Sequence, residues 1–213
     1  MVNMKRINTF VAGLAALVSL LFLMACDSNS GAEDEPNEIV AERVTDFAAD
    51  PFVGFVDGRP VGTGKYAFFS LQTGLEIDAA DSASTAWDIA LQGTNMIVNG
   101  GSSGPGQGGA QVVEGIFEEI MEAPATGWVV DSDQGTAIVA GSGNGWYNYN
   151  PASMVVSPMP GRVLLIRTAD GRFAKIKIIS YYRGAPETPT AESEARFYTF
   201  DYVFQPDGSR SFL

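Results

Sequence analysis

The stretch Trp87-Asp-Ile-Ala-Leu-Gln-Gly-Thr-Asn-Met-Ile-Val-Asn-Gly-Gly-Ser-Ser-Gly-Pro-Gly-Gln-Gly-Gly-Ala110 carries the strongest structural signals in this chain. In its first half, Ile89, Leu91 and Val98 suit a pleated, half-buried strand. Its second half, residues 99–110, is rich in glycine, which lets another backbone or a ligand approach closely. A strand that leads into such a loop ends either at a tight structural crossing or at the rim of a site. The sequence is compatible with both.

Short apolar runs separated by turn residues flank this stretch. The expected strands are residues 52–56, 59–61, 66–71, 128–130 and 136–139. The first two flank Asp57-Gly58, which is typical of a hairpin turn, and the last two flank a second turn at residues 131–135. Residues 39–47 suit either a helix face or an edge strand, and residues 112–121 suit either a helical turn or a strand.

The last third of the chain predicts an antiparallel meander. Residues 162–168 and 173–181 flank a turn, and residues 197–204 alternate aromatic side chains with others. In the second of these strands, Lys175 and Lys177 alternate with isoleucines, which predicts one solvated and one buried face. Short strands throughout, with no long amphipathic helix, indicate an all-β fold.

Three segments divide the chain. Residues 1–25 predict a lipoprotein signal peptide: a charged start, then an apolar run shorter than the ~20 residues that span a bilayer, ending in Leu-Met-Ala-Cys26. This ending looks like a bacterial lipobox, and Cys26 is the only cysteine, so we expect lipidation there; a plain secretory signal with an incidental cysteine is the alternative. Residues 26–38 form an acidic tether, and residues 39–213 a single antiparallel β domain. We expect a lipid-anchored protein of the bacterial cell envelope, at the outer membrane or the cell surface.

The composition limits the partners and the chemistry. The formal net charge is −12, and loss of the signal peptide removes Lys5 and Arg6 but no acidic residue, which argues against a nucleic-acid partner. There is no histidine, which excludes Ser-His-Asp and Cys-His nucleophiles and histidine metal sites. We therefore expect a protein that is not an enzyme.

Two motifs are better explained as turns than as sites. Residues 104–109 satisfy Gly-x-Gly-x-x-Gly, but no βαβ unit surrounds them, so dinucleotide binding is rejected. Asp131-x-Asp133-x-Gly135 begins like a calcium loop, but the third oxygen ligand and the closing glutamate are missing. A surface turn is the better interpretation of these residues.

The chain resembles the HmuY family of haem-binding surface lipoproteins of Bacteroidota. The resemblance rests on Trp87-Asp-Ile-Ala with the Asn-Gly-Gly, Ser-Gly and Gly-x-Gly-Gly-Ala runs after it, and on residues 162–182 and 197–204, all in family order. It covers most of the chain from about Tyr66 onward. It implies an all-β fold and a haem or other tetrapyrrole ligand. An outer-membrane receptor is a candidate partner.

The resemblance also implies axial haem ligands, which are two histidines in the founding member. Both are absent here, and the second would fall near Asn150. Some relatives use methionine pairs, and thioether sulfur is a haem ligand. The candidate ligand-binding residues are therefore Met154, Met159, Tyr147 and Tyr149, with Met154 or Met159 on the metal if haem binds. The alternative is a surface scaffold or interaction lipoprotein that has lost haem binding.

Overall fold

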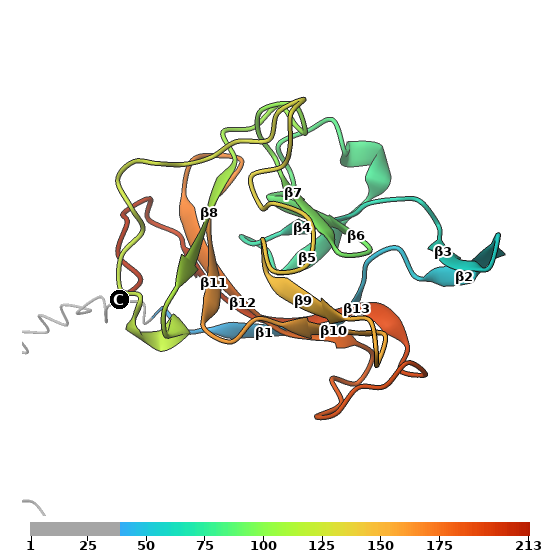
Figure 1. Cartoon of the computed structure of the whole chain (residues 1–213). Coiled ribbons are helices and arrows are strands. Elements are labelled where there is room, and N and C mark those ends of the chain that lie inside the picture. Colours follow the sequence, from blue (N-terminus) through green and yellow to red (C-terminus); the bar gives the residue numbers. More distant parts are fainter. Residues whose placement is uncertain (1–38) are drawn as a thin grey trace, which may run out of the picture. The chain divides into compact units, whose positions relative to one another are not determined.

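The computed structural model describes residues 39–213, whose regular structure is almost wholly antiparallel strand (Figure 1). The predicted all-β fold is confirmed. The large sheet contains, in spatial order, β1 (Glu42–Ala48), β13 (Ala195–Gln205), β12 (Phe173–Tyr182), β11 (Arg162–Arg167) and β8 (Gly109–Glu114). The small sheet contains β5 (Leu75–Ile77), β4 (Ala67–Ser70), β6 (Ile89–Gln92) and β7 (Asn95–Val98).

Two hairpins stand apart from these sheets. They are β2 (Phe52–Val56) with β3 (Arg59–Gly62), and β9 (Tyr147–Asn150) with β10 (Val155–Pro158). Two short 3-10 turns, η1 (Ala79–Asp81) and η2 (Phe117–Glu119), complete the regular structure of the described residues. No helix within residues 39–213 has the length and apolar character to cross a membrane. The ambiguous segment 39–47 is an edge strand, because β1 pairs with β13 alone.

The predicted meander forms the centre of the large sheet. Strand β12 pairs with β11 on one side and with β13 on the other, so that Ile176 lies opposite both Leu164 and Tyr202. The aromatic alternation of β13 directs Tyr198, Phe200 and Tyr202 into the core, where each is at most 1% exposed. Period-two patterning therefore predicted the inward face of these strands correctly.

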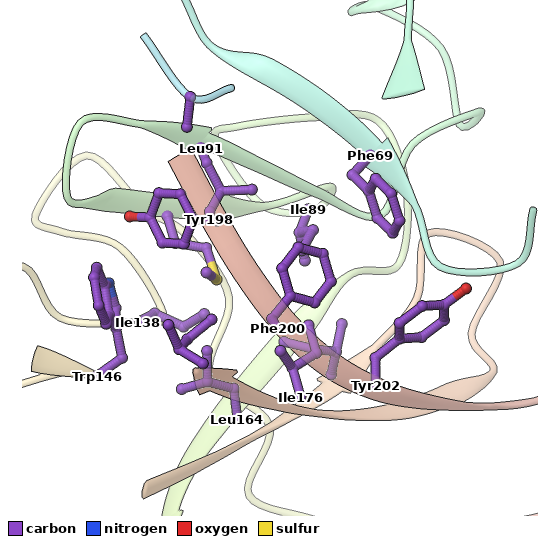
Figure 2. Packing of buried hydrophobic residues seen from close by; sticks show 14 of the residues in the cluster. Phe69, Ile89, Leu91, Ile138, Trp146, Leu164, Ile176, Tyr198, Phe200 and Tyr202 are labelled. Atoms are coloured by element: carbon purple, nitrogen blue, oxygen red, sulfur yellow. The ribbon is translucent and has the colours of Figure 1, made fainter. Parts of the chain in front are cut away.

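The core lies between the two sheets (Figure 2). Phe69 of the small sheet meets Phe200 of the large sheet edge to face, with ring centroids 5.4 Å apart. Side chains from both sheets meet around this pair, namely Ile89, Leu91, Leu164, Ile176, Tyr198 and Tyr202. Each buried aromatic pair adds about 0.5–1.5 kcal/mol beyond the area that it removes from water.

The outer face of the large sheet is also covered, which corrects one prediction. Lys175 is only 4% exposed, and its Nζ donates to the backbone oxygens of Phe117 (2.7 Å) and Ile120 (2.9 Å). The predicted solvated face is therefore wrong for Lys175, whose pKa is lowered by burial. Lys177 lies nearer the edge of this cover and pairs with the exposed Glu118 at 2.7 Å. The outer face and its cover together form a second apolar cluster, in which Val163, Leu165 and Val203 come from the sheet and Phe117, Ala123 and Phe212 cover them.

The glycine run is a tight backbone crossing. A Cβ on Gly100 would overlap the backbone of Gly108, and a Cβ on Gly108 would overlap the backbone of Asn99. The fully buried Asn99 ties the run together, since its amide donates to the backbone oxygen of Trp87 (2.8 Å) and accepts from the amide of Gly106 (3.0 Å). The sequence was compatible with a tight crossing or with the rim of a site, and the structure shows a tight crossing.

Asp131 corrects a second prediction. The surface turn holds for residues 132–135, where Ser132 and Gly135 bridge, but Asp131 itself is 1% exposed. Its carboxylate accepts hydrogen bonds from the backbone amides of Val98 (2.9 Å) and Ala137 (2.6 Å). Val98 lies in the edge strand β7, so the carboxylate supplies the acceptor that a neighbouring strand would otherwise provide. Residues 128–130 and 136–139 accordingly do not form the expected hairpin; only isolated bridges occur there.

The signal peptide, the tether and the lipidation site at Cys26 lie outside the described residues. The boundaries after residues 25 and 38 therefore remain predictions. The described residues themselves form one compact unit.

Candidate ligand-binding cavity

An aromatic-lined cavity of about 750 Å³ lies between the two hairpins and the segment that leads into β13. Hairpin β2–β3 contributes Phe52, Phe55 and Pro60, and the β9–β10 hairpin contributes Tyr149 and Met154. Tyr181 and Tyr182 of β12 and the segment 190–196 complete its lining. Ligand pockets of about 300–1,000 Å³ with mostly apolar and aromatic walls are typical of small-molecule and cofactor sites.

The hairpin β2–β3 exposes large apolar side chains at this cavity. Phe52 is 48% and Phe55 70% exposed, and their rings meet edge to face with centroids 5.2 Å apart. On the opposite wall, Tyr149 is 45% and Met154 61% exposed. Exposed apolar side chains gathered at one concave place indicate a surface that another molecule covers.

The inner wall is built on the large sheet and is fixed by contacts with the core. Tyr182 accepts a hydrogen bond at its hydroxyl from the backbone amide of Val156 (2.8 Å), which joins β12 to β10. Tyr181 is buried against Trp146 and Tyr198 in the core. Burial raises the pKa of both Tyr181 and Tyr182, so both phenols stay neutral at physiological pH.

Two residues with a strained backbone line the same cavity. Six residues other than glycine have a positive φ in the described part of the chain, and two of the six are among the residues that line the cavity. They are Asp46, Asp50, Asp57, Met154, Ala185 and Arg196. Asp57 follows from the hairpin turn, but Met154 (φ 55°) and Arg196 (φ 73°) line the cavity itself. Residues held in such conformations cluster at ligand sites.

The four candidate ligand-binding residues from the sequence lie in three different parts of the structure. Tyr149 and Met154 line the aromatic cavity together. Tyr147 is 8% exposed in the core, and its hydroxyl accepts from Thr94 at 3.2 Å. Met159 lines a different cavity of about 370 Å³, beside η2 and β11.

Sequence reasoning missed Phe52 and Phe55 as site residues. A signal was present in the sequence, because residues 52–56 are apolar at both odd and even positions, so both faces of the strand are apolar. In the structure, the hairpin pairs with neither sheet. Phe52, Val53, Phe55 and Val56 are all exposed. A strand that is apolar on both faces needs cover on both.

The resemblance to the HmuY family implies a haem ligand, so the side chains at the cavity that could bind its iron are relevant. No cluster of three or more metal-binding side chains of the histidine, cysteine or carboxylate kind occurs within residues 39–213. Among the exposed side chains that line the cavity, the thioether of Met154 and the phenol of Tyr149 are donors of kinds that bind haem iron. The volume and the aromatic walls fit a flat apolar ring system, and Met154 and Tyr149 are the residues that would hold its metal.

These features define an all-β protein with an aromatic cavity between hairpins β2–β3 and β9–β10. The family model described as HmuY protein matches residues 63–202, and the chain belongs to the HmuY family. Among solved structures, the apo HmuY analog of Tannerella forsythia is similar, with a TM-score of 0.51 and 16% identity over 81% of this chain and 100% of that one. Apo PinO of Porphyromonas gingivitis gives a TM-score of 0.45 and 18% identity over 79% and 97% of the two chains. Among curated proteins, none matches the chain.

Proposed function

We propose that this protein is a non-catalytic, haemophore-like lipoprotein that takes haem or another tetrapyrrole into the aromatic cavity. The observation that carries the proposal is the cavity wall itself. Phe52, Phe55, Tyr149 and Met154 are each between 45% and 70% exposed around a space of about 750 Å³. A flat apolar ligand would cover all four, and its burial would contribute about 25 cal/mol for each Å² of apolar surface removed from water. Membership of the HmuY family supports a tetrapyrrole as that ligand.

Met154 is the first candidate for an axial ligand. It lies in the tight turn between β9 and β10, and it lines the cavity together with Phe52 and Phe55. The phenol of Tyr149, one strand position from the same turn, is the second candidate. When bound, haem supplies an iron centre; a soft thioether favours its ferrous state and a phenolate its ferric state.

An absorbance titration of the purified protein with haemin, oxidised and after dithionite reduction, tests this proposal. Ligation by Met154 gives tighter binding after reduction and a sharp low-spin spectrum, which Met154→Ala removes without unfolding the protein. Met159→Ala is the matched control, since it removes a thioether outside the cavity. Ligation by Tyr149 instead gives a ferric high-spin complex that reduction weakens and Tyr149→Phe removes.

A broad, unsaturable spectrum in both oxidation states is the result that contradicts haem binding. The function would then be the alternative, a surface scaffold or interaction lipoprotein that has lost its haem site. The absence of histidine from the whole chain is the observation that favours this alternative.

The proposal includes anchoring through lipid at Cys26, with residues 26–38 as a tether and an outer-membrane receptor as the partner that would accept the ligand. The lipobox-like end of residues 1–25 supports it. Metabolic labelling with a palmitate analogue should mark the wild type and leave Cys26→Ser unmarked. Equal labelling of the two would contradict lipidation at this residue.

A further inference from the structure

The hairpin β2–β3 is attached to the large sheet at its base through Asp50. This residue precedes β2, and its Oδ1 accepts from the hydroxyl of Thr63 (3.0 Å) and the amide of Gly64 (2.7 Å), which follow β3. Its Oδ2 and backbone oxygen both accept from Nη1 of Arg196, at 2.6 and 2.9 Å. One carboxylate therefore joins the two ends of the hairpin to the start of β13.

These contacts are more than a surface ion pair. The side chain of Asp50 is 8% exposed and that of Arg196 is 20% exposed, whereas exposed pairs contribute little. Both residues have a positive φ, 65° for Asp50 and 73° for Arg196, so the fold holds both in costly conformations. The amide of Ala49 also donates to the backbone oxygen of Arg196 at 2.8 Å, so the chain that enters the hairpin is fixed at the same point.

The hairpin needs this attachment because its strands pair only with each other. A two-stranded hairpin alone is marginally stable in water. Figure 1 shows β2 and β3 projecting away from the two sheets, joined to them at their base. Phe52 and Phe55 reach the cavity from this projecting element, so their position depends on the angle at which the base is held.

We propose that Asp50 and Arg196 are positioning residues that fix hairpin β2–β3 over the cavity and so hold Phe52 and Phe55 as its outer wall. The consequence for ligand retention rests on the proposed function. The consequence for the hairpin itself does not. We call the contacts among Asp50, Thr63, Gly64 and Arg196 the hairpin clasp.

Gly62 provides a steric way to open the clasp without altering any of its polar groups. A Cβ at Gly62 would overlap Nη1 of Arg196 and Oδ1 of Asp50. Gly62→Ala therefore places a methyl group between the two charged side chains. Asp50→Asn is the complementary change: it weakens the ion pair, keeps an oxygen acceptor and keeps a residue type that tolerates positive φ.

The test combines amide hydrogen exchange of the ligand-free protein with the dissociation rate of bound haemin. In Gly62→Ala and Asp50→Asn, we expect the amides of residues 52–61 to exchange at least tenfold faster, while those of β11 and β12 keep their wild-type rates. Haemin should then dissociate at least tenfold faster. The matched control is Arg43→Gln, which removes the exposed Arg43–Asp201 pair that also joins β1 to β13. It should change neither measurement.

Each outcome decides between the two proposals. Unchanged exchange in residues 52–61 of both variants overturns the clasp. Faster exchange in a protein that does not bind haemin supports the clasp and overturns the proposed function. Faster exchange with unchanged dissociation of haemin overturns the positioning role, because the hairpin would then not hold the ligand.

Discussion

The glycine crossing and the aromatic cavity are opposite kinds of region. In the crossing, residues 99–110 pack so closely that Gly100 and Gly108 have no room for a Cβ, and Asn99 is fully buried. At the cavity, Phe52 and Phe55 are about half exposed or more, on a hairpin that pairs with neither sheet. The crossing is polar and glycine-rich yet buried where Asn99, Gly100 and Gly108 meet, whereas the cavity wall is apolar yet exposed.

This contrast shows where function is to be sought in the fold. Buried polar groups with every hydrogen bond satisfied specify one structure, and in the described residues no buried side-chain polar atom lacks a partner. The exposed aromatic side chains have no such role in the fold, and two residues with a positive φ, Met154 and Arg196, line the same cavity. The glycine-rich motif of the sequence therefore serves the fold, and the less conspicuous hairpin β2–β3 serves the candidate site.

The largest effect is expected from the core between the sheets. Phe200→Ala should lower the free energy of unfolding by about 3–5 kcal/mol, because it deletes a ring that is 1% exposed and that contacts Phe69. Denaturant unfolding measures this change. A loss as small as that of an exposed residue would contradict the packing between the two sheets.

The next effect concerns the crossing. Gly100→Ala should cost about 3 kcal/mol, at the upper end for overpacking, because its Cβ overlaps rigid backbone. Gly135→Ala is the matched control, since a Cβ there meets nothing within 4 Å and its φ is not left-handed. Equal stabilities of the two variants would show that the run has room for side chains, and would reopen it as the rim of a site.

A smaller effect distinguishes the two lysines of β12. Lys175→Met keeps the apolar stem but leaves the backbone oxygens of Phe117 and Ile120 without their donor, which should cost about 1–3 kcal/mol. Lys177→Met removes an exposed pair with Glu118 and should cost under about 1 kcal/mol. Thermal or denaturant melts of the two variants compare them directly. The reverse order would restore the solvated face that the alternation predicts for Lys175.

The smallest effect on stability is expected at the cavity. Phe55→Ser should change the free energy of unfolding by less than about 0.5 kcal/mol, since Phe55 is 70% exposed. The same variant should weaken haemin binding severalfold, because it removes part of the cavity wall. A large loss of stability with unchanged binding would reverse the comparison between the two regions.

Local patterning determined most of the strands from the sequence alone. The alternation in β12 and β13, the Asp57-Gly58 turn and the turn at residues 169–171 each act over a few residues, so the hairpins and the inward face follow from them. Two of the four candidate ligand residues, Tyr149 and Met154, were brought to one cavity, because they flank the same turn.

Only the tertiary structure decided what covers each face and which residues converge. Lys175 is buried by the backbone of Phe117, 58 positions away in the chain, and Asp131 completes the edge of a strand 33 positions before it. The clasp joins Asp50 to Arg196 across 146 positions. Side-chain alternation has a period of two and carries no record of such distant partners, so the pattern predicts two faces but not which of them water reaches.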